Sequence, residues 1–146
     1  MRIAHSVRAR VFSQDGEDEE AITNALLSLF PFDVRKHLTR TTATGVYDQP
    51  IVILELQVTS ERETTQAMKH VIELLSTDDR KRLLTQKEKR LDENLRFYFR
   101  LAKPGLLSND IHLTDDGNCV HFTIHIATYP RSKSRALALL SSIIET

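Results

Sequence analysis

Hydrophobic and polar residues alternate with a period of two in several stretches of the chain, and this period is typical of β-strands. The alternation is clear over residues 2–12, 51–58 and 95–101, and it is weaker over 34–42. In the first stretch, the mainly apolar side consists of Ile3, His5, Val7, Ala9 and Val11. The opposite side, which we expect to face outward, consists of Arg2, Ala4, Ser6, Arg8 and Arg10. The sequence therefore predicts a first strand with an arginine-bearing outer face.

Apolar residues at helical spacing, together with capping signals, predict helices between and after these strands. Ser60 and Glu63 have the spacing of a capping box, and an amphipathic pattern follows them. A mostly charged helix is predicted over 77–92. It has few apolar residues to bury, so we expect it to be peripheral or to pack against something outside the chain. The last helix is predicted to begin near Ser132 or Ser134.

Residues 110–126 predict a β-hairpin that turns at Asp116-Gly117, because this pair suits the positive φ angles of a two-residue type I′ turn. The turn sets the register of the hairpin and would place His112 opposite His121. The hydrophobic alternation of the two strands agrees with this register, which supports the prediction.

The predicted elements follow the order β-α-β-β-α-α-β-β-β-α within a single domain, residues 1–146. Neighbouring strands with helices between the groups favour an α+β fold, in which a mostly antiparallel sheet has helices packed on one face. The chain has 146 residues, of which 40% are hydrophobic and 27% charged. That length and composition are sufficient to bury such a core without staples.

Composition and charge exclude several classes of protein. No apolar run approaches the roughly 18 residues of a membrane span, and the amino terminus lacks the apolar stretch of a secretory signal. The single cysteine, Cys119, excludes an internal disulfide framework and suits a reducing cytoplasm, which is the predicted location. The formal net charge of zero argues against a nonspecific coat on nucleic acid, although acidic and basic residues are segregated along the chain.

The alternation of the strands defines an outer face of the predicted sheet. From the hairpin this face would carry His112, Thr114, Cys119, His121, Thr123 and His125. From the other strands it would gain Arg8, Arg10, Glu55, Gln57, Arg96, Tyr98 and Arg100. The chemistry of these side chains is open to a metal site, a catalytic site, an RNA-binding surface or a plain solvated face.

The residues that suggest a metal site are Cys119, His112 and His121, but their spacing does not favour one. Zinc takes about four ligands near 2.0–2.3 Å, and His125 lies about 13 Å along the strand from His121. Catalysis has no better support, because the sequence contains no nucleophile elbow, zinc-protease motif or phosphate-binding glycine loop. We therefore predict no metal, no cofactor and no catalytic residue.

RNA binding fits the residue types of the outer face better. Arginines bind phosphates and stack on bases, and Tyr98 offers an aromatic surface. Hydrogen bonds from the histidines and Thr123 could reach bases or 2′-hydroxyl groups. The predicted RNA-binding residues are Arg8, Arg10, Arg96, Tyr98, Arg100, His121, Thr123 and His125, with Arg131, Lys133 and Arg135 at the start of the last helix. An alternative is a non-enzymatic subunit that contacts a partner protein, or a second copy of the chain, through the charged helix over 77–92 without contacting RNA.

Three stretches together resemble a known family: VRARVFSQDGEDEEAITNALLSLFPFD from Val7, KRLDENLRFYFRLAK from Lys89 and IHLTDDGNCVHFTIHIATYP from Ile111. They are similar to an archaeal family of small proteins described as RNA-binding and as predicted exosome-associated subunits, domain-of-unknown-function family 54. The resemblance spans the chain from Val7 to the last helix and rests on overall pattern. It implies a fold similar to that of ribosomal protein L five, an archaeal cytoplasmic origin and a non-enzymatic role in RNA handling, and it transfers no site residues.

Overall fold

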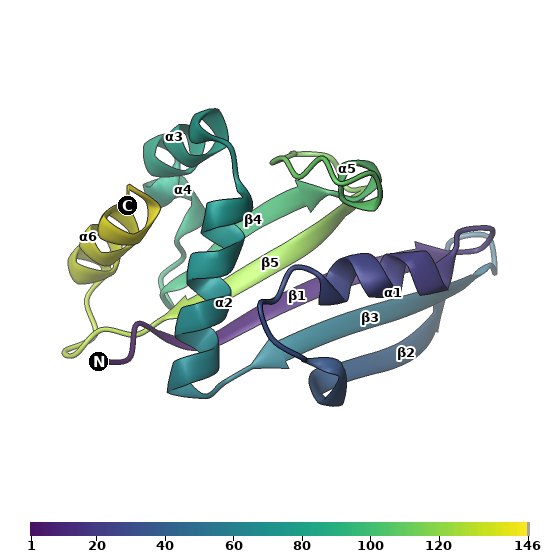
Figure 1. The fold of residues 1–146 in the computed structure, drawn as a ribbon, viewed down its shortest axis with the longest axis horizontal. Coiled ribbons are helices and arrows are strands. Elements are labelled where there is room, and N and C mark those ends of the chain that lie inside the picture. The colour runs from purple at the N-terminus through teal and green to yellow at the C-terminus, as the bar shows by residue number, and fades with distance from the viewer. Residues whose placement is uncertain (146) are drawn as a thin grey trace.

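A computed structural model describes residues 1–145, which form one five-stranded antiparallel sheet with helices (Figure 1). The strands are β1 (Ala4–Gln14), β2 (Leu38–Thr44), β3 (Pro50–Val58), β4 (Arg96–Ala102) and β5 (Cys119–Ile126). The helices are α1 (Glu19–Leu27), α2 (Glu61–Leu74), α3 (Thr77–Thr85), α4 (Lys87–Arg90), α5 (Lys103–Leu107) and α6 (Lys133–Ile144), with a short 3-10 helix, η1 (Arg35–His37). The strand order is β2-β3-β1-β5-β4, so the first and last strands of the chain lie side by side in the middle of the sheet.

Helices α1 and α2 lie across one face of the sheet, and α3, α4 and α6 pack against one another beside β4 (Figure 1). The apolar sides of β1, β3, β4 and β5 meet the helices in one hydrophobic core, against which Leu38 of β2 packs. Its largest fully buried side chains include Phe97, Phe99 and Phe122. This arrangement confirms the predicted α+β fold with an antiparallel sheet and helices on one face. No helix within residues 1–145 is long and apolar enough to cross a membrane.

Side-chain caps begin the longer helices close to the predicted positions. The Ser60 hydroxyl accepts a hydrogen bond of 3.1 Å from the Glu63 backbone N–H and donates one of 3.2 Å to the Glu63 carboxylate. The Ser132 hydroxyl caps α6 by accepting a hydrogen bond of 3.3 Å from the Arg135 backbone N–H. The predicted charged helix over 77–92 is instead two helices, which are separated at Gln86.

The predicted hairpin over 110–126 is wrong. Strand β5 pairs with β1 and β4, whereas the preceding segment touches the sheet through one bridge, between Leu113 and Leu101 on the other edge of β4. The chain reaches this edge through a tight bend at Gly105, where an added Cβ would lie 2.3 Å from the Asp110 carbonyl oxygen. His112 and His121 therefore lie on opposite sides of β4, about two strand spacings or ~10 Å apart.

A register shift between Ala4 and Ser6 corrects the predicted sides of β1. Ala4 is fully buried, and its carbonyl oxygen accepts a hydrogen bond of 3.2 Å from the buried hydroxyl of Thr64 on α2. His5 then contacts His125 on the other side of the sheet, although the alternation places it among the apolar residues. From Val7 onward the predicted alternation holds, with Val7, Ala9 and Val11 buried.

Candidate nucleic-acid interface

The pairing of β1, β5 and β4 arranges the predicted outer-face side chains in rows across the sheet, on the side opposite α1 and α2. Cα partners in antiparallel strands point to the same side, so the strand registers define these rows. The rows are Arg10–His121–Arg100, Arg8–Thr123–Tyr98 and Ser6–His125–Arg96. We call this side of β1, β5 and β4 the outer face. It brings together eight of the predicted residues, from Arg8 to His125.

Three arginines of the outer face lack a direct hydrogen-bond or ion-pair partner for their guanidinium groups within the described residues. The guanidinium groups of Arg8, Arg10 and Arg96 make no hydrogen bond or ion pair with any residue in the described range, 1–145. The Arg10 guanidinium instead lies over the Phe12 ring, 5.3 Å from its centroid, and its Nε atom is buried without a partner. Glu55 of β3 is the register partner of Arg10, yet the two side chains form no ion pair. A surface of this kind attracts anions.

Tyr98 and His121 form a stacked pair of rings in the middle of the outer face. Their centroids are 5.8 Å apart, and their planes are inclined by 22°. The Tyr98 hydroxyl donates a hydrogen bond of 3.1 Å to the Asp92 carboxylate, which fixes the orientation of the ring. Burial and this hydrogen bond raise the pKa of Tyr98, so its hydroxyl remains protonated. The pair offers a rigid surface on which a planar base can stack.

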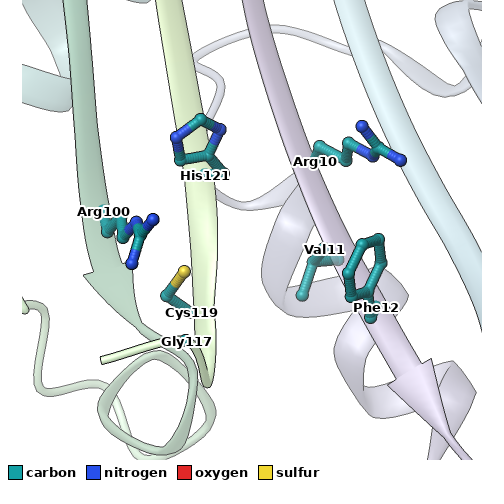
Figure 2. A pocket seen from close by; sticks show the side chains of 7 residues that line it. All are labelled: Arg10, Val11, Phe12, Arg100, Gly117, Cys119 and His121. Carbon is teal, nitrogen blue, oxygen red and sulfur yellow. The ribbon is translucent and has the colours of Figure 1, made fainter. Parts of the chain in front are cut away.

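A depression of about 210 Å³ lies beside this pair, between β1, β5 and β4. Figure 2 shows Arg10 and Phe12 on β1, Cys119 and His121 on β5, and Arg100 on β4 around it. Burial lowers the pKa of His121, and the nearby arginines, Arg100 first, lower it further. At neutral pH the imidazole is therefore mainly uncharged and can both donate and accept hydrogen bonds.

A second group of rings lies at the other end of β5. The centroids of His5 and His125 are 4.9 Å apart, and the exposed Tyr129 ring meets His5 edge-on with centroids 6.1 Å apart. Burial lowers the pKa of His125, and the charges of Arg96 and other neighbours lower it further. Arg131 adjoins this group in a shallow pocket.

The basic residues at the start of α6 lie beside the outer face and not on its strands. Arg131 donates hydrogen bonds to the Glu93 carbonyl and the Asn94 side chain, beside the beginning of β4. Arg135 donates to the Tyr129 carbonyl, and Lys133 is exposed on the first turn of α6. These residues flank the outer face at one end, and they are not part of its rows.

Thr123 has an environment that the sequence does not reveal. It lies in the central row of the face but is only 4% exposed, and its hydroxyl oxygen is buried without a hydrogen-bond partner in residues 1–145. Its register partners on the two sides are Arg8 and Tyr98.

The three residues considered for a metal site do not come together. His112 lies beside Gly105, beyond β4, whereas Cys119 and His121 are on β5. Within residues 1–145, no three side chains of His, Cys, Asp or Glu are grouped as metal ligands. Burial raises the pKa of the Cys119 thiol, which therefore lacks the thiolate character of a nucleophile.

Three ring-bearing residues of this interface were missed in the sequence: His5, Phe12 and Tyr129. Phe12 follows the alternation of Arg8 and Arg10, so the same period that revealed the arginines could have found it. His5 could not be found this way, because the register shift reverses its side of the strand. Tyr129 lies after the strand, where alternation gives no information.

Comparison with known proteins shows one family and several similar structures. A family model described as RNA binding matches residues 6–126. The RNA-binding protein PAB1135 of Pyrococcus abyssi is 26% identical over 147 residues, which cover 97% of this chain and 94% of that protein. Protein AF2318 from Archaeoglobus fulgidus, a DUF54 protein, is 25% identical with a TM-score of 0.85, covering 96% of this chain and 99% of the other. The DUF54 protein Mth689 from Methanothermobacter thermautotrophicus is also 25% identical, with a TM-score of 0.79 and coverage of 97% and 98%.

Proposed function

The chain belongs to the family described as RNA binding, which confirms the resemblance noted in its sequence, and from this premise we propose that it binds RNA on the outer face of its sheet. The observation that carries this assignment is the set of unpaired guanidinium groups of Arg8, Arg10 and Arg96. Positive charges without internal partners repel one another, and phosphates of an RNA strand relieve this repulsion.

The geometry of the face suits single-stranded or unpaired RNA. Bases can stack on the Tyr98–His121 pair and on Phe12, while the arginines between these rings contact the backbone. Hydrogen bonds from His121, His125 and the otherwise unpartnered Thr123 hydroxyl are available to base edges and 2′-hydroxyl groups. In this proposal Arg100 lies at one edge of the face.

The basic start of α6 extends the proposed interface beyond the sheet. Arg131, Lys133 and Arg135 follow directly after the exposed Tyr129, next to the His5–His125 pair. An RNA strand that crosses the rows of the outer face from Arg100 toward Arg96 next reaches this basic segment. We assign to it contacts with phosphates only, because its long side chains are exposed.

The cellular role that we propose is binding without catalysis. It is that of an accessory subunit in RNA processing or degradation in the cytoplasm, in association with the exosome. Copurification of RNA-degrading subunits with the tagged chain, both with and without ribonuclease treatment, tests this association. The likeness to ribosomal protein L five stays a prediction, as does a protein partner or homodimer that binds through the charged segment over 77–92.

The test of the RNA-binding face compares two variants with the same loss of charge. One replaces Arg8, Arg10 and Arg96 by Gln, and the control replaces the exposed Arg62, Lys69 and Lys81, all of which lie on the helices. Affinity for a short single-stranded RNA is measured by fluorescence anisotropy at about 50 and about 200 mM salt.

We expect the face variant to bind RNA at least about tenfold more weakly than the control, with a salt dependence reduced by up to about three ions. A uniform loss in both variants would show that net charge alone binds RNA. Equal binding by the face variant and the parent chain would overturn the proposal.

A further inference from the structure

Helices α3 and α4 direct arginines toward one carboxylate at the edge of the outer face. Asp115 lies in the exposed loop before β5, and its Oδ2 atom is 2.5 Å from Nη2 of Arg82. Its Oδ1 atom is 3.9 Å from Nη2 of Arg90, and its backbone carbonyl accepts a hydrogen bond of 3.2 Å from Arg100. Three guanidinium groups from three different elements thus converge on one residue.

Contacts that do not involve Asp115 hold Arg90 in place. The Arg90 side chain is only 14% exposed, and it donates hydrogen bonds of 3.0 and 2.7 Å to the Gln86 side chain and one of 3.3 Å to the Tyr98 carbonyl. Burial lowers the pKa of Arg90, and the neighbouring charges of Arg82 and Arg100 lower it further. Arg90 is therefore a fixed positive charge beside those of Arg82 and Arg100, an arrangement that is costly to the protein.

Asp115 neutralises this cluster incompletely. Its side chain is 80% exposed, so water screens its charge, and it supplies one negative charge against three. Arg90, Arg100 and Asp115 line an open depression of about 560 Å³. Its wall also includes Lys89, Asp92, Tyr98 and His121. The site thus combines three arginines with one exposed carboxylate, that of Asp115. It adjoins the stacked rings of Tyr98 and His121 on the outer face.

We propose that Arg82, Arg90 and Arg100 form a binding site for a phosphate group of RNA and that Asp115 occupies it as an internal substitute until RNA binds. This inference rests on the proposed function, since it supplies the phosphate position for a nucleotide whose base lies on Tyr98 and His121. Guanidinium groups bind carboxylates and phosphates with the same forked geometry, which is why one can replace the other. The phosphate is either an internal diester or a terminal monoester, and both share this chemistry.

The test removes the internal anion and compares the result with a neighbouring change of equal charge. Asp115→Asn opens the site, whereas Asp116→Asn alters the next residue of the same loop, whose carboxylate accepts a hydrogen bond from the Asn118 backbone and forms no ion pair in residues 1–145. The probes are a single-stranded oligouridylate with a free 5′-hydroxyl group and the same strand with a 5′-phosphate.

We expect D115N to bind the probes about fivefold to tenfold more tightly than D116N, because the internal competitor is gone. A gain that is equal for the two probes assigns the site to a backbone diester, and a gain confined to the phosphorylated probe assigns it to a terminal phosphate. Equal affinities of D115N and D116N within about twofold, or weaker binding by D115N, overturn the inference.

Two further measurements test the anion site, the first of them without RNA. Inorganic phosphate should raise the melting temperature of D115N more than that of the parent chain or D116N. This measurement detects anion binding at the site without RNA. Arg82→Gln should weaken RNA binding more than Lys81→Gln, its exposed neighbour on α3. If the parent chain binds RNA but neither result is obtained, this inference fails and the proposed function stands. If the parent chain does not bind RNA, the proposed function fails, and the response to phosphate still decides whether the anion site exists.

Discussion

Two groups of arginines carry the same charge in this chain and use it differently. Arg80 of α3 donates to carbonyl oxygens near the end of α2, and Arg40 of β2 pairs with Glu19 of α1. On the outer face, Arg8, Arg10 and Arg96 have no such partners within residues 1–145. Formal charge alone does not distinguish the two groups, although the arginines of the outer face alternate with buried apolar residues of their strands.

The difference shows which charges stabilise the fold and which are available to a ligand. A guanidinium group that donates to backbone carbonyls or to a carboxylate contributes to the folded state, and removing it leaves acceptors without a donor. An unpaired guanidinium group on a sheet face contributes little to folding and repels its neighbours. Predictions that separate stability from RNA affinity therefore test this comparison directly.

The largest effect on RNA affinity is expected from loss of the Tyr98 ring, and not from loss of a charge on the outer face. Tyr98→Ala removes the stacking surface beside His121, and a lost base stack costs about 1–3 kcal/mol, so affinity should fall roughly tenfold or more. Tyr98→Phe keeps the ring and should retain most of the affinity, while its stability falls because Asp92 loses a hydrogen bond. Anisotropy titrations of both variants measure this. Equal losses for Ala and Phe would mean that the hydroxyl, and not the ring, contacts RNA.

A smaller effect separates the two groups of arginines. Arg80→Ala deletes hydrogen bonds of 3.1 Å to the Ile72 and Glu73 carbonyls, and it should lower the free energy of unfolding by about 1–2 kcal/mol with RNA affinity unchanged. Arg96→Ala should weaken RNA binding about threefold to tenfold and change stability by less than about 0.5 kcal/mol. Urea denaturation and RNA titration of both variants are the measurements. The comparison is wrong if the two variants show the same changes in stability and in RNA affinity.

The alternation of single strands predicted most of the outer face, because a period of two needs no knowledge of neighbouring strands. Arg8, Arg10, Arg96, Tyr98 and Arg100 were placed on one side in this way, and the strand registers confirm it. The capping box at Ser60 was equally local and is confirmed in its position.

What the sequence failed to predict depends on contacts between distant segments. The Asp-Gly pair at 116–117 is a strong local turn signal, but Leu113 pairs with Leu101, and its backbone N–H donates to Asp79 on α3. These tertiary contacts outweigh the local preference for a hairpin. In the same way, Asp115 is an ordinary turn residue until the fold brings Arg82 and Arg90 to it.

The smallest predicted effect is that of pH. It distinguishes the permanent charges of the arginines from the charge that His121 gains when it is protonated. Burial holds the pKa of His121 below its ordinary value of about 6.5, and the charges of Arg100, Arg8 and Arg10 lower it further. The folded state therefore binds a proton on His121 less readily than the unfolded chain does. Stability contributed by this group is present above about pH 6.5 and is lost as the pH falls through the folded-state pKa.

RNA affinity should change in the opposite direction. Phosphates near the outer face favour the protonated forms of His121 and His125, so binding takes up protons and should strengthen about threefold from about pH 7.5 to about pH 5.5. Replacing both histidines by Gln should remove this dependence, whereas His70→Gln on helix α2 should leave it intact. Titrations at constant ionic strength measure the change. Weaker binding at low pH would mean that the neutral imidazoles contact the bases and that the added charge does not reach the phosphates, which would confine the electrostatic part of the interface to its arginines.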